Sequence, residues 1–264
     1  MTALTTAVAA PRFKVRGLRG AAVSATSLVA GALVWQLIGN HTKQASFVSF
    51  TATVRALYHL ARSGVLFDAL WASLQIFGAG LAIATAIGFL GGLVLARLRI
   101  LRIALDPYFA ALYATPMVAL IPYILIIFGF GFGAKVIVVT LFAVWPILIN
   151  TLEGARSVSE ELLEVARSYR SSEPKLWRHV IVPYTLPFAM TGLRQGLARA
   201  LVGMIVAEFF LSASGLGELI IINTQRFETA NVLAAVLVMT LLATLLMGIG
   251  RAVENYFARW KVGA

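Results

Sequence analysis

Apolar residues are gathered along this chain in long runs separated by shorter polar segments. The runs cover residues 20–39, 67–96, 107–130, 136–152, 184–211 and 232–250. Each approaches the ~20 residues that an α-helix needs to cross the hydrocarbon core of a bilayer. The pattern predicts an all-α polytopic membrane helix bundle of about six transmembrane helices.

The first run follows a basic segment, as the apolar region of a secretory signal peptide would. Ala30, Gly31 and Ala32 also have the small-residue spacing of a cleavage site. That triplet lies in the middle of the run, however, with apolar residues continuing to Ile38. We therefore expect an uncleaved transmembrane helix.

Two of the other runs contain residues that change how a helix packs. Gly88 and Gly92 have a small-residue spacing that lets another helix backbone approach closely. Pro116 and Pro122 each remove a helical hydrogen bond and free a carbonyl, and Thr115 can satisfy one of these. We expect the third helix to be bent, and buried in protein or facing water.

The segment that follows the fifth run is too apolar for a solvated loop and too interrupted for a spanning helix. It reads SASGLGELIIINTQRFETAN. A short re-entrant or interfacial helix around residues 218–223 fits this pattern.

The composition agrees with a membrane protein. Hydrophobic residues make up 60% of the chain and charged residues 12%, with a mean hydropathy of +0.88, whereas roughly a quarter of residues are charged in soluble domains. The net charge of +11 comes from Lys and Arg in short groups beside the apolar runs. Because they form neither a face nor a tail, they do not indicate a nucleic-acid partner.

The distribution of basic residues predicts the orientation. With the N-terminus inside, inner segments hold 15 Lys and Arg and outer segments 5, the latter including Lys135 and Arg226. Short cytoplasmic loops carry such an excess, so both termini are expected in the cytoplasm. We divide the chain into an N-terminal part (1–66), a core transmembrane domain (67–250) and a C-terminal tail (251–264).

Several kinds of chemistry are excluded by missing residues. The chain has no cysteine and only three scattered histidines, which argues against a metal site or a thiol nucleophile. None of its five Lys precedes Ser or Thr, so no phosphate-binding loop of the form GxxxxGK[ST] is present. We expect no cofactor, and any ATP hydrolysis must occur on a partner.

One inner segment, 153–183, is much longer than a simple connection requires. Ser157 and Glu160 have capping-box spacing and predict a helix start. A single apolar stripe follows, opposite the charged positions. Its members are Val158, Leu162, Val165, Ala166 and Tyr169.

A second short helix is expected after the break at residues 171–174. It covers residues 175–180 and ends at Pro183, which starts the fifth span. Two such helices could lie on lipid headgroups, but this segment has as many Glu as Lys and Arg. A nearly neutral segment binds an anionic surface weakly, so docking to a cytoplasmic protein is favoured.

At this point the residues resemble the permease subunits of bacterial binding-protein-dependent ABC importers. The family signature is Glu-Ala-Ala, a Gly four residues on and Ile-x-Leu-Pro about ten residues later; here 164–166, Arg170 and 180–183 occupy those places. The resemblance covers about residues 73–260 and is closest to the branch importing nitrate, sulfonates, taurine and thiamine precursors. Further similar stretches are ATPMVALIPYILIIFGFG, ILINTLEGARSV, LPFAMTGLRQGLARAL and AEFFLSASGLGELI.

The chain departs from the signature at Arg170. The family glycine looks like a left-handed helix stop, where a residue with a Cβ is disfavoured by roughly 1 kcal/mol. We expect the turn to be reshaped by one more helical residue before Ser171. Val165 and Val182 are mild replacements.

The resemblance implies a type I ABC importer permease fold in the bacterial cytoplasmic (inner) membrane. It also implies a homodimer, two ATP-binding cassette ATPase subunits on the cytoplasmic loops, and a periplasmic or lipid-anchored substrate-binding protein. The expected ATPase-docking residues are Glu164, Val165, Ala166, Tyr169, Arg170, Ser171 and Ser172. Leu176 and Trp177 are expected to anchor this coupling loop to the membrane domain.

Polar residues within the spans are candidates for the translocation path. Glu208 is either a lining or gate residue, or a structural partner of another helix or of Arg226. Arg199 either faces an aqueous vestibule or pairs with a partner subunit. Gln195 and Thr115 are weaker candidates, because isolated polar residues in bundles commonly hydrogen-bond between helices.

Two other classes of protein remain to be weighed. A secondary transporter driven by an ion gradient would favour paired intramembrane acids or inverted repeats, whereas Glu208 is the only acid deep in a predicted span. An intramembrane enzyme would need a nucleophile and a base, and no HExxH, buried Asp pair or intraspan His occurs. An ATP-coupled permease fits the residues best.

Overall fold

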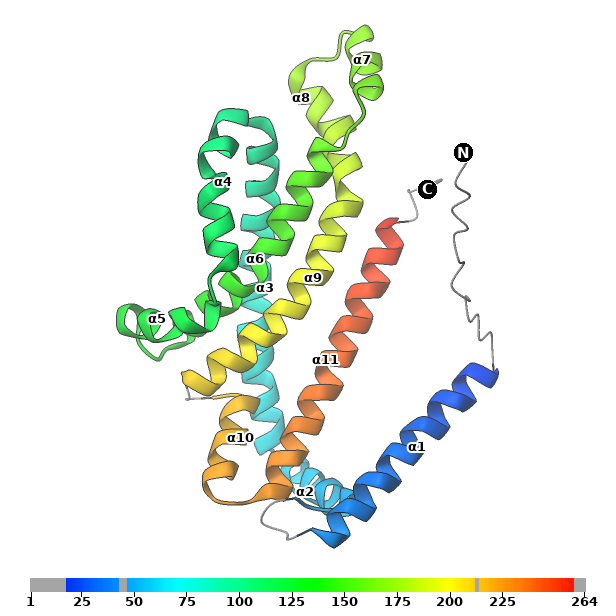
Figure 1. Ribbon diagram of the computed structural model, residues 1–264, viewed down its shortest axis with the longest axis vertical. Helices are drawn as coiled ribbons and strands as arrows, with labels where there is room; N and C mark the ends of the chain where they lie inside the picture. Colours follow the sequence, from blue (N-terminus) through cyan, green and yellow to red (C-terminus); the bar gives the residue numbers. More distant parts are fainter. Residues whose placement is uncertain (1–17, 43–46, 212–213, 259–264) are drawn as a thin grey trace, which may run out of the picture.

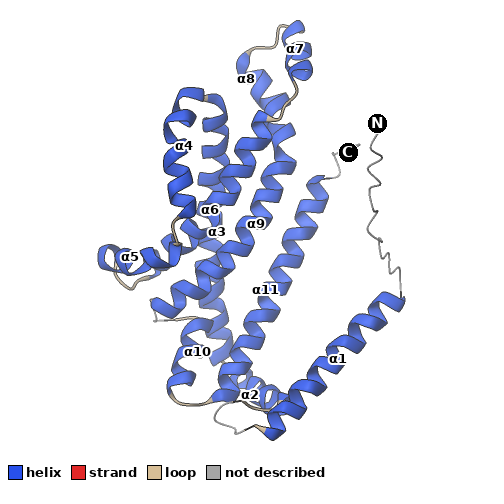
Figure 2. Ribbon diagram, viewed as in Figure 1, coloured by secondary structure: helices blue, strands red, loops and turns tan. Residues whose placement is uncertain are grey.

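The computed structural model describes residues 18–42, 47–211 and 214–258, and every regular element in these ranges is helical (Figures 1 and 2). The long helices are α1 (Leu18–His41), α3 (Val65–Arg97), α6 (Phe132–Arg156), α9 (Val182–Phe210) and α11 (Thr229–Ala258). The shorter ones are α2 (Phe50–Arg62), α4 (Arg99–Ala114), η1 (Met117–Leu120), α5 (Ile121–Phe128), α7 (Glu160–Ser168), α8 (Glu173–Leu176), η2 (Trp177–Ile181) and α10 (Leu216–Gln225). The predicted all-α class is confirmed.

The core of the bundle is α6, which lies between α3 and α9. Glycines on both neighbours allow a close approach. A Cβ added to Gly88 on α3 would lie 2.8 Å from the Cβ of Ile147 on α6. A Cβ added to Gly196 on α9 would lie 2.7 Å from the Cγ1 of the same Ile147. A Cβ added to Gly92 would lie 2.7 Å from the Cβ of Thr151 on α6. The close packing predicted at Gly88 and Gly92 is therefore confirmed, with α6 as the partner.

Four of the described helices are long and apolar enough to cross a membrane. They are Ala22–His41, Val65–Arg97, Phe132–Arg156 and Thr229–Phe257. The fifth predicted span corresponds to α9, whose 29 residues would extend about 43 Å at 1.5 Å per residue. Its Arg194 forms an ion pair with Glu254 of α11, which reduces the cost of a charge among these helices.

The prediction that the third span forms a single bent helix is wrong. The helix α4 already begins at Arg99, where a loop was expected, and it ends at Ala114. Thr115 then has an extended backbone, as the residue before a proline prefers. Pro122 lies in the first turn of α5, where its missing N–H costs nothing. The run therefore forms two helices, and α5 turns aside from the bundle (Figure 1).

Two short helices lie at the end of the bundle opposite α7 and α8 (Figure 1). The helix α10 confirms the short helix expected around residues 218–223. The helix α2 was not predicted, because its basic residues Arg55, His59 and Arg62 interrupt any apolar run. Ser49 caps it through a hydrogen bond from the amide of Ala52, and α1 packs against it.

The glycine contacts with α6 predict unequal effects of the same substitution at two positions of α3. Gly88→Ala should destabilise the protein by about 1–3 kcal/mol, because its new methyl group overlaps Ile147. Gly78→Ala is the matched control, since no atom lies within 4 Å of its added Cβ. Thermal unfolding in detergent measures both variants. Equal midpoints for the two variants would contradict the packing described here.

Candidate functional site

The long inner segment forms a helical hairpin, α7 and α8, at the end of the molecule where α3 meets α4 (Figure 1). Two boundaries differ from the prediction. The cap of α7 is Ser159, which accepts a hydrogen bond from the amide of Leu162 at 3.5 Å, whereas Ser157 still belongs to the end of α6. The amide of Ser157 bonds to the carbonyl of Glu153 at 3.0 Å, so Ser157 is the C-cap of α6, which ends at Arg156, and not the N-cap of α7.

The second helix does not end at Pro183. From Glu173 the chain runs through α8 and the π-helical turn Trp177–Ile181 directly into α9. The Val182 amide bonds to the carbonyl of Trp177, five residues back. This wider turn, common at functional sites, precedes Pro183 in the first turn of α9, where proline is tolerated. The α8 arm of the hairpin and α9 are thus one continuous helical run.

A small apolar cluster attaches the hairpin to this run. Val158, Leu176 and Ile181 are buried together, and Trp177 and Leu163 pack against them. The ion pair between Arg97 and Glu173, at 3.3 Å, is more than half exposed on both sides. Such an exposed ion pair contributes about 0–1 kcal/mol to folding stability, whereas burying a leucine side chain contributes about 1.5–3 kcal/mol. Leu176 therefore holds the hairpin more firmly than the ion pair.

The predicted apolar stripe of α7 divides into an inner and an outer part. Val158 is buried and Ala166 is half-buried, facing the cluster. Leu162, Val165 and Tyr169 are instead 45%, 56% and 83% exposed. We call these three residues the outer apolar face. The other predicted docking residues lie beside it: Glu164, Arg170 and Ser172 are exposed and Ser171 is half-buried.

The turn after α7 is a left-handed helix stop at Arg170, the position where the signature described above has glycine. Arg170 adopts a left-handed backbone with φ 51°. Its amide donates a hydrogen bond to the carbonyl of Arg167 at 2.8 Å, and the amide of Ser171 donates one to the carbonyl of Ala166 at 3.2 Å. These two bonds define a Schellman helix stop. The prediction that α7 would gain one more helical residue before Ser171 is therefore wrong. The two hydrogen bonds hold Arg170 in the left-handed conformation, which a residue with a Cβ disfavours.

The predicted path residues do not form one cluster. Gln195 and Arg199 are exposed on α9, and Gln195 accepts a hydrogen bond from Asn150 of α6 at 3.3 Å. Thr115 is half-buried at the end of α4, where its hydroxyl bonds to the carbonyl of Ala111. Glu208 is fully buried near the other end of α9.

Glu208 belongs to a polar cluster that the sequence did not reveal. Its carboxylate accepts hydrogen bonds from the Ser73 hydroxyl at 2.5 Å and from the Gly217 amide at 2.7 Å. Lys135, assigned above to an outer loop, is only 2% exposed and donates to the carbonyl of Ser214 at 3.1 Å. Its place just outside a predicted span concealed this burial.

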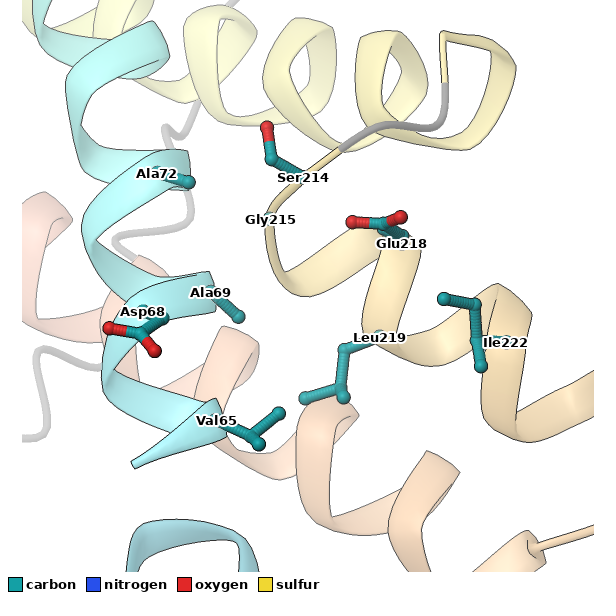
Figure 3. Close-up of a pocket in the computed structure, with 9 residues that line it drawn as sticks. All are labelled: Val65, Asp68, Ala69, Ala72, Ser214, Gly215, Glu218, Leu219 and Ile222. Atoms are coloured by element: carbon teal, nitrogen blue, oxygen red, sulfur yellow. The ribbon is translucent and has the colours of Figure 1, made fainter. Parts of the chain in front are cut away.

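A groove of about 300 Å³ lies beside this cluster, between α3 and α10 (Figure 3). Asp68, Ala69 and Ala72 line it from α3, and Ser214 and Glu218 line it from the segment that begins α10. In the part of the chain that the structure describes, no group of three or more His, Cys, Asp or Glu could hold a metal ion.

Residues 84–261 match the family described as "Binding-protein-dependent transport system inner membrane component". The chain belongs to this family. The match includes α6, the hairpin, α9, α10 and α11, and so takes in the signature positions 164–166, Arg170 and 180–183.

Relatives and a solved structure agree with this assignment. The permease is 38% identical over 166 residues to the riboflavin transport system permease protein RibX of Chloroflexus aurantiacus, covering 63% of this chain and 62% of that protein, less than two thirds of its length. It is 30% identical over 230 residues to the putative aliphatic sulfonates transport permease protein SsuC of Bacillus subtilis, covering 86% and 83% of the two chains.

A chain of the MetNI methionine ABC transporter, solved in inward-facing conformations, has the same fold. The TM-score is 0.64 at 18% identity, over 75% of this permease and 99% of that chain. The expected ABC importer permease fold and membership of the sulfonate and nitrate branch are confirmed, whereas nothing supports an ion-gradient transporter.

The left-handed turn at Arg170 predicts a stabilising substitution. Arg170→Gly should stabilise the turn by about 1 kcal/mol, because glycine has no Cβ to oppose a positive φ. Hydrogen exchange at the amide of Ser171 should then slow about fivefold. Arg170→Ala is the matched control, since it removes the charge but keeps the Cβ. Equal slowing in both variants would assign the effect to the charge.

Proposed function

We propose that this permease forms, as a homodimer, the translocation path of an ABC importer whose ATP is hydrolysed by two partner ATPase subunits. A periplasmic or lipid-anchored binding protein delivers the solute, and both termini face the cytoplasm. The hairpin of α7 and α8 is the coupling element that the ATPase subunits grip. In this arrangement the permease itself binds no nucleotide.

One observation carries the proposal: the outer apolar face lies at the tip of a hairpin that continues directly into α9. Among the described residues, Leu162, Val165 and Tyr169 remain 45–83% exposed, and exposed apolar residues rimmed by charges are typical of protein interfaces. An ATPase groove over this face would bury them and receive Glu164 and Arg170 at the rim. Any displacement of the groove would then move α9.

Two exposed polar residues on α9 support a dimer. Gln195 and Arg199 lie on the protomer surface, on a helix that packs within the bundle. An arginine directed at lipid would be costly, so this face suits an aqueous path or a second copy of the chain. We assign Gln195 and Arg199 to the path between two copies.

The proposed cargo is a small solute such as a sulfonate, nitrate, taurine or a thiamine precursor. The named relatives carry chemically different cargoes, riboflavin and aliphatic sulfonates, on similar permeases. Selectivity in such a system resides largely in the binding protein. Measuring ligand binding to the cognate binding protein would identify the cargo.

Reconstitution with the cognate ATPase tests the coupling role. Glu164→Lys and Val165→Asp should abolish stimulation of ATP hydrolysis by the loaded binding protein, because each places a new charge in the docking groove or at its rim. Glu160→Lys, the same charge change in the first turn of α7, is the control and should retain most stimulation. All three proteins should insert into membranes at equal amounts. Normal uptake by Glu164→Lys and Val165→Asp would refute the docking surface.

A further inference from the structure

The start of α10 is held by side chains from other helices. Gly215, its N-cap residue, offers no side-chain cap. The amide of Leu216 instead donates to the Ser73 hydroxyl of α3 at 2.9 Å, and the amide of Gly217 donates to the Glu208 carboxylate of α9 at 2.7 Å. Free amides at a helix start are costly away from water. The Ser73 and Glu208 oxygens accept these two hydrogen bonds, and the Glu208 carboxyl group lies at the positive end of the helix dipole.

The fit around Glu208 is close on every side. Its side chain has no exposed surface. A Cβ added to Gly215 would lie 2.2 Å from its Oε1, and one added to Gly217 would lie 2.6 Å from its Cβ. Since Ser73 accepts the Leu216 amide, its own proton is free to bond Glu208, which it does at 2.5 Å. The backbone of α10 is thereby locked to both α9 and α3.

The other end of the same helix carries the coupling hairpin. The run from Glu173 to Phe210 is helical throughout, so Leu176 at the hairpin and Glu208 at the far end belong to one continuous element. The groove between α3 and α10 is bordered by Ser214 and Gly215, the residues that precede the hydrogen-bonded amides of Leu216 and Gly217 (Figure 3). A displacement of α9 would therefore also shift α10 at this groove.

We propose that Glu208 is a positioning residue that, together with Ser73, links α10 to α9 and so transmits hairpin movement to the outer end of the permease. The link rests on the proposed function, because an ATPase must move the hairpin. It makes Glu208 a coupling residue whose carboxylate does not need to contact the solute.

Paired spin labels measure the link directly. The chain has no cysteine, so Asp68→Cys and Ile222→Cys place labels on the two sides of the groove without background. In the assembled transporter the distance between the labels should change on ATP binding. Glu208→Ala should abolish this change and lower uptake per ATP hydrolysed about tenfold or more, while basal ATP hydrolysis persists.

Ser73→Ala provides a second, milder variant that decides the question if Glu208→Ala does not assemble. It should reduce the distance change and the uptake per ATP in the same direction, and in the double variant the two losses should not add. Thr224→Ala is the matched control, since its hydroxyl bonds only within α10, to Ile220. That variant should behave as the unmodified protein.

The outcomes separate the link from the proposed function. If the unmodified assembly shows neither ATP-driven uptake nor a distance change, the proposed function fails. If it shows both, and Glu208→Ala or Ser73→Ala leaves the distance change and the uptake per ATP intact, the link is overturned. A variant that only lowers the melting temperature, with coupling unchanged, likewise overturns it and reduces the cluster to a structural role.

Discussion

The close approach of α3 and α9 to the central helix α6 is the constraint on which the other features depend. Ile147 of α6 is only 1% exposed because Gly88 and Gly196 bring two helix backbones against it. Lipid offers no hydrophobic drive for helix association, so dispersion contacts at such short range must supply it. The resulting three-helix body holds the hairpin at one end and α10 at the other.

The hairpin combines a firm attachment with an uncovered surface. Leu176 and Trp177 pack it onto the end of α6 and the start of α9, while the outer apolar face remains exposed. The π-helical turn lets α8 continue into α9 past Pro183 without a break in the helix. Arg170 stops α7 in a conformation that glycine adopts more readily, so the turn has a small cost in stability.

At the other end, polar groups perform the function that apolar packing performs at the hairpin. Glu208, Ser73 and Lys135 satisfy backbone groups in and just before α10. Because these partners come from α9, α3 and α6, the position of α10 is determined by three helices together. A short helix with a cap of its own would lack this dependence on its neighbours.

Much of this permease could be predicted from local pattern. The length of the apolar runs determined the helical membrane class, and the signature around residues 164–166 and 180–183 determined the family and the hairpin. Hydropathy pattern failed at three places. The break at Thr115 and Pro116 and the left-handed turn at Arg170 follow from local backbone preferences and hydrogen bonds that the apolar pattern does not reveal. The burial of Lys135 depends instead on a contact with Ser214, which is distant in sequence. The partners of Glu208 lie 135 residues away at Ser73 and across a turn at Gly217, so only the folded chain, by bringing these helices within hydrogen-bond distance, could assign them.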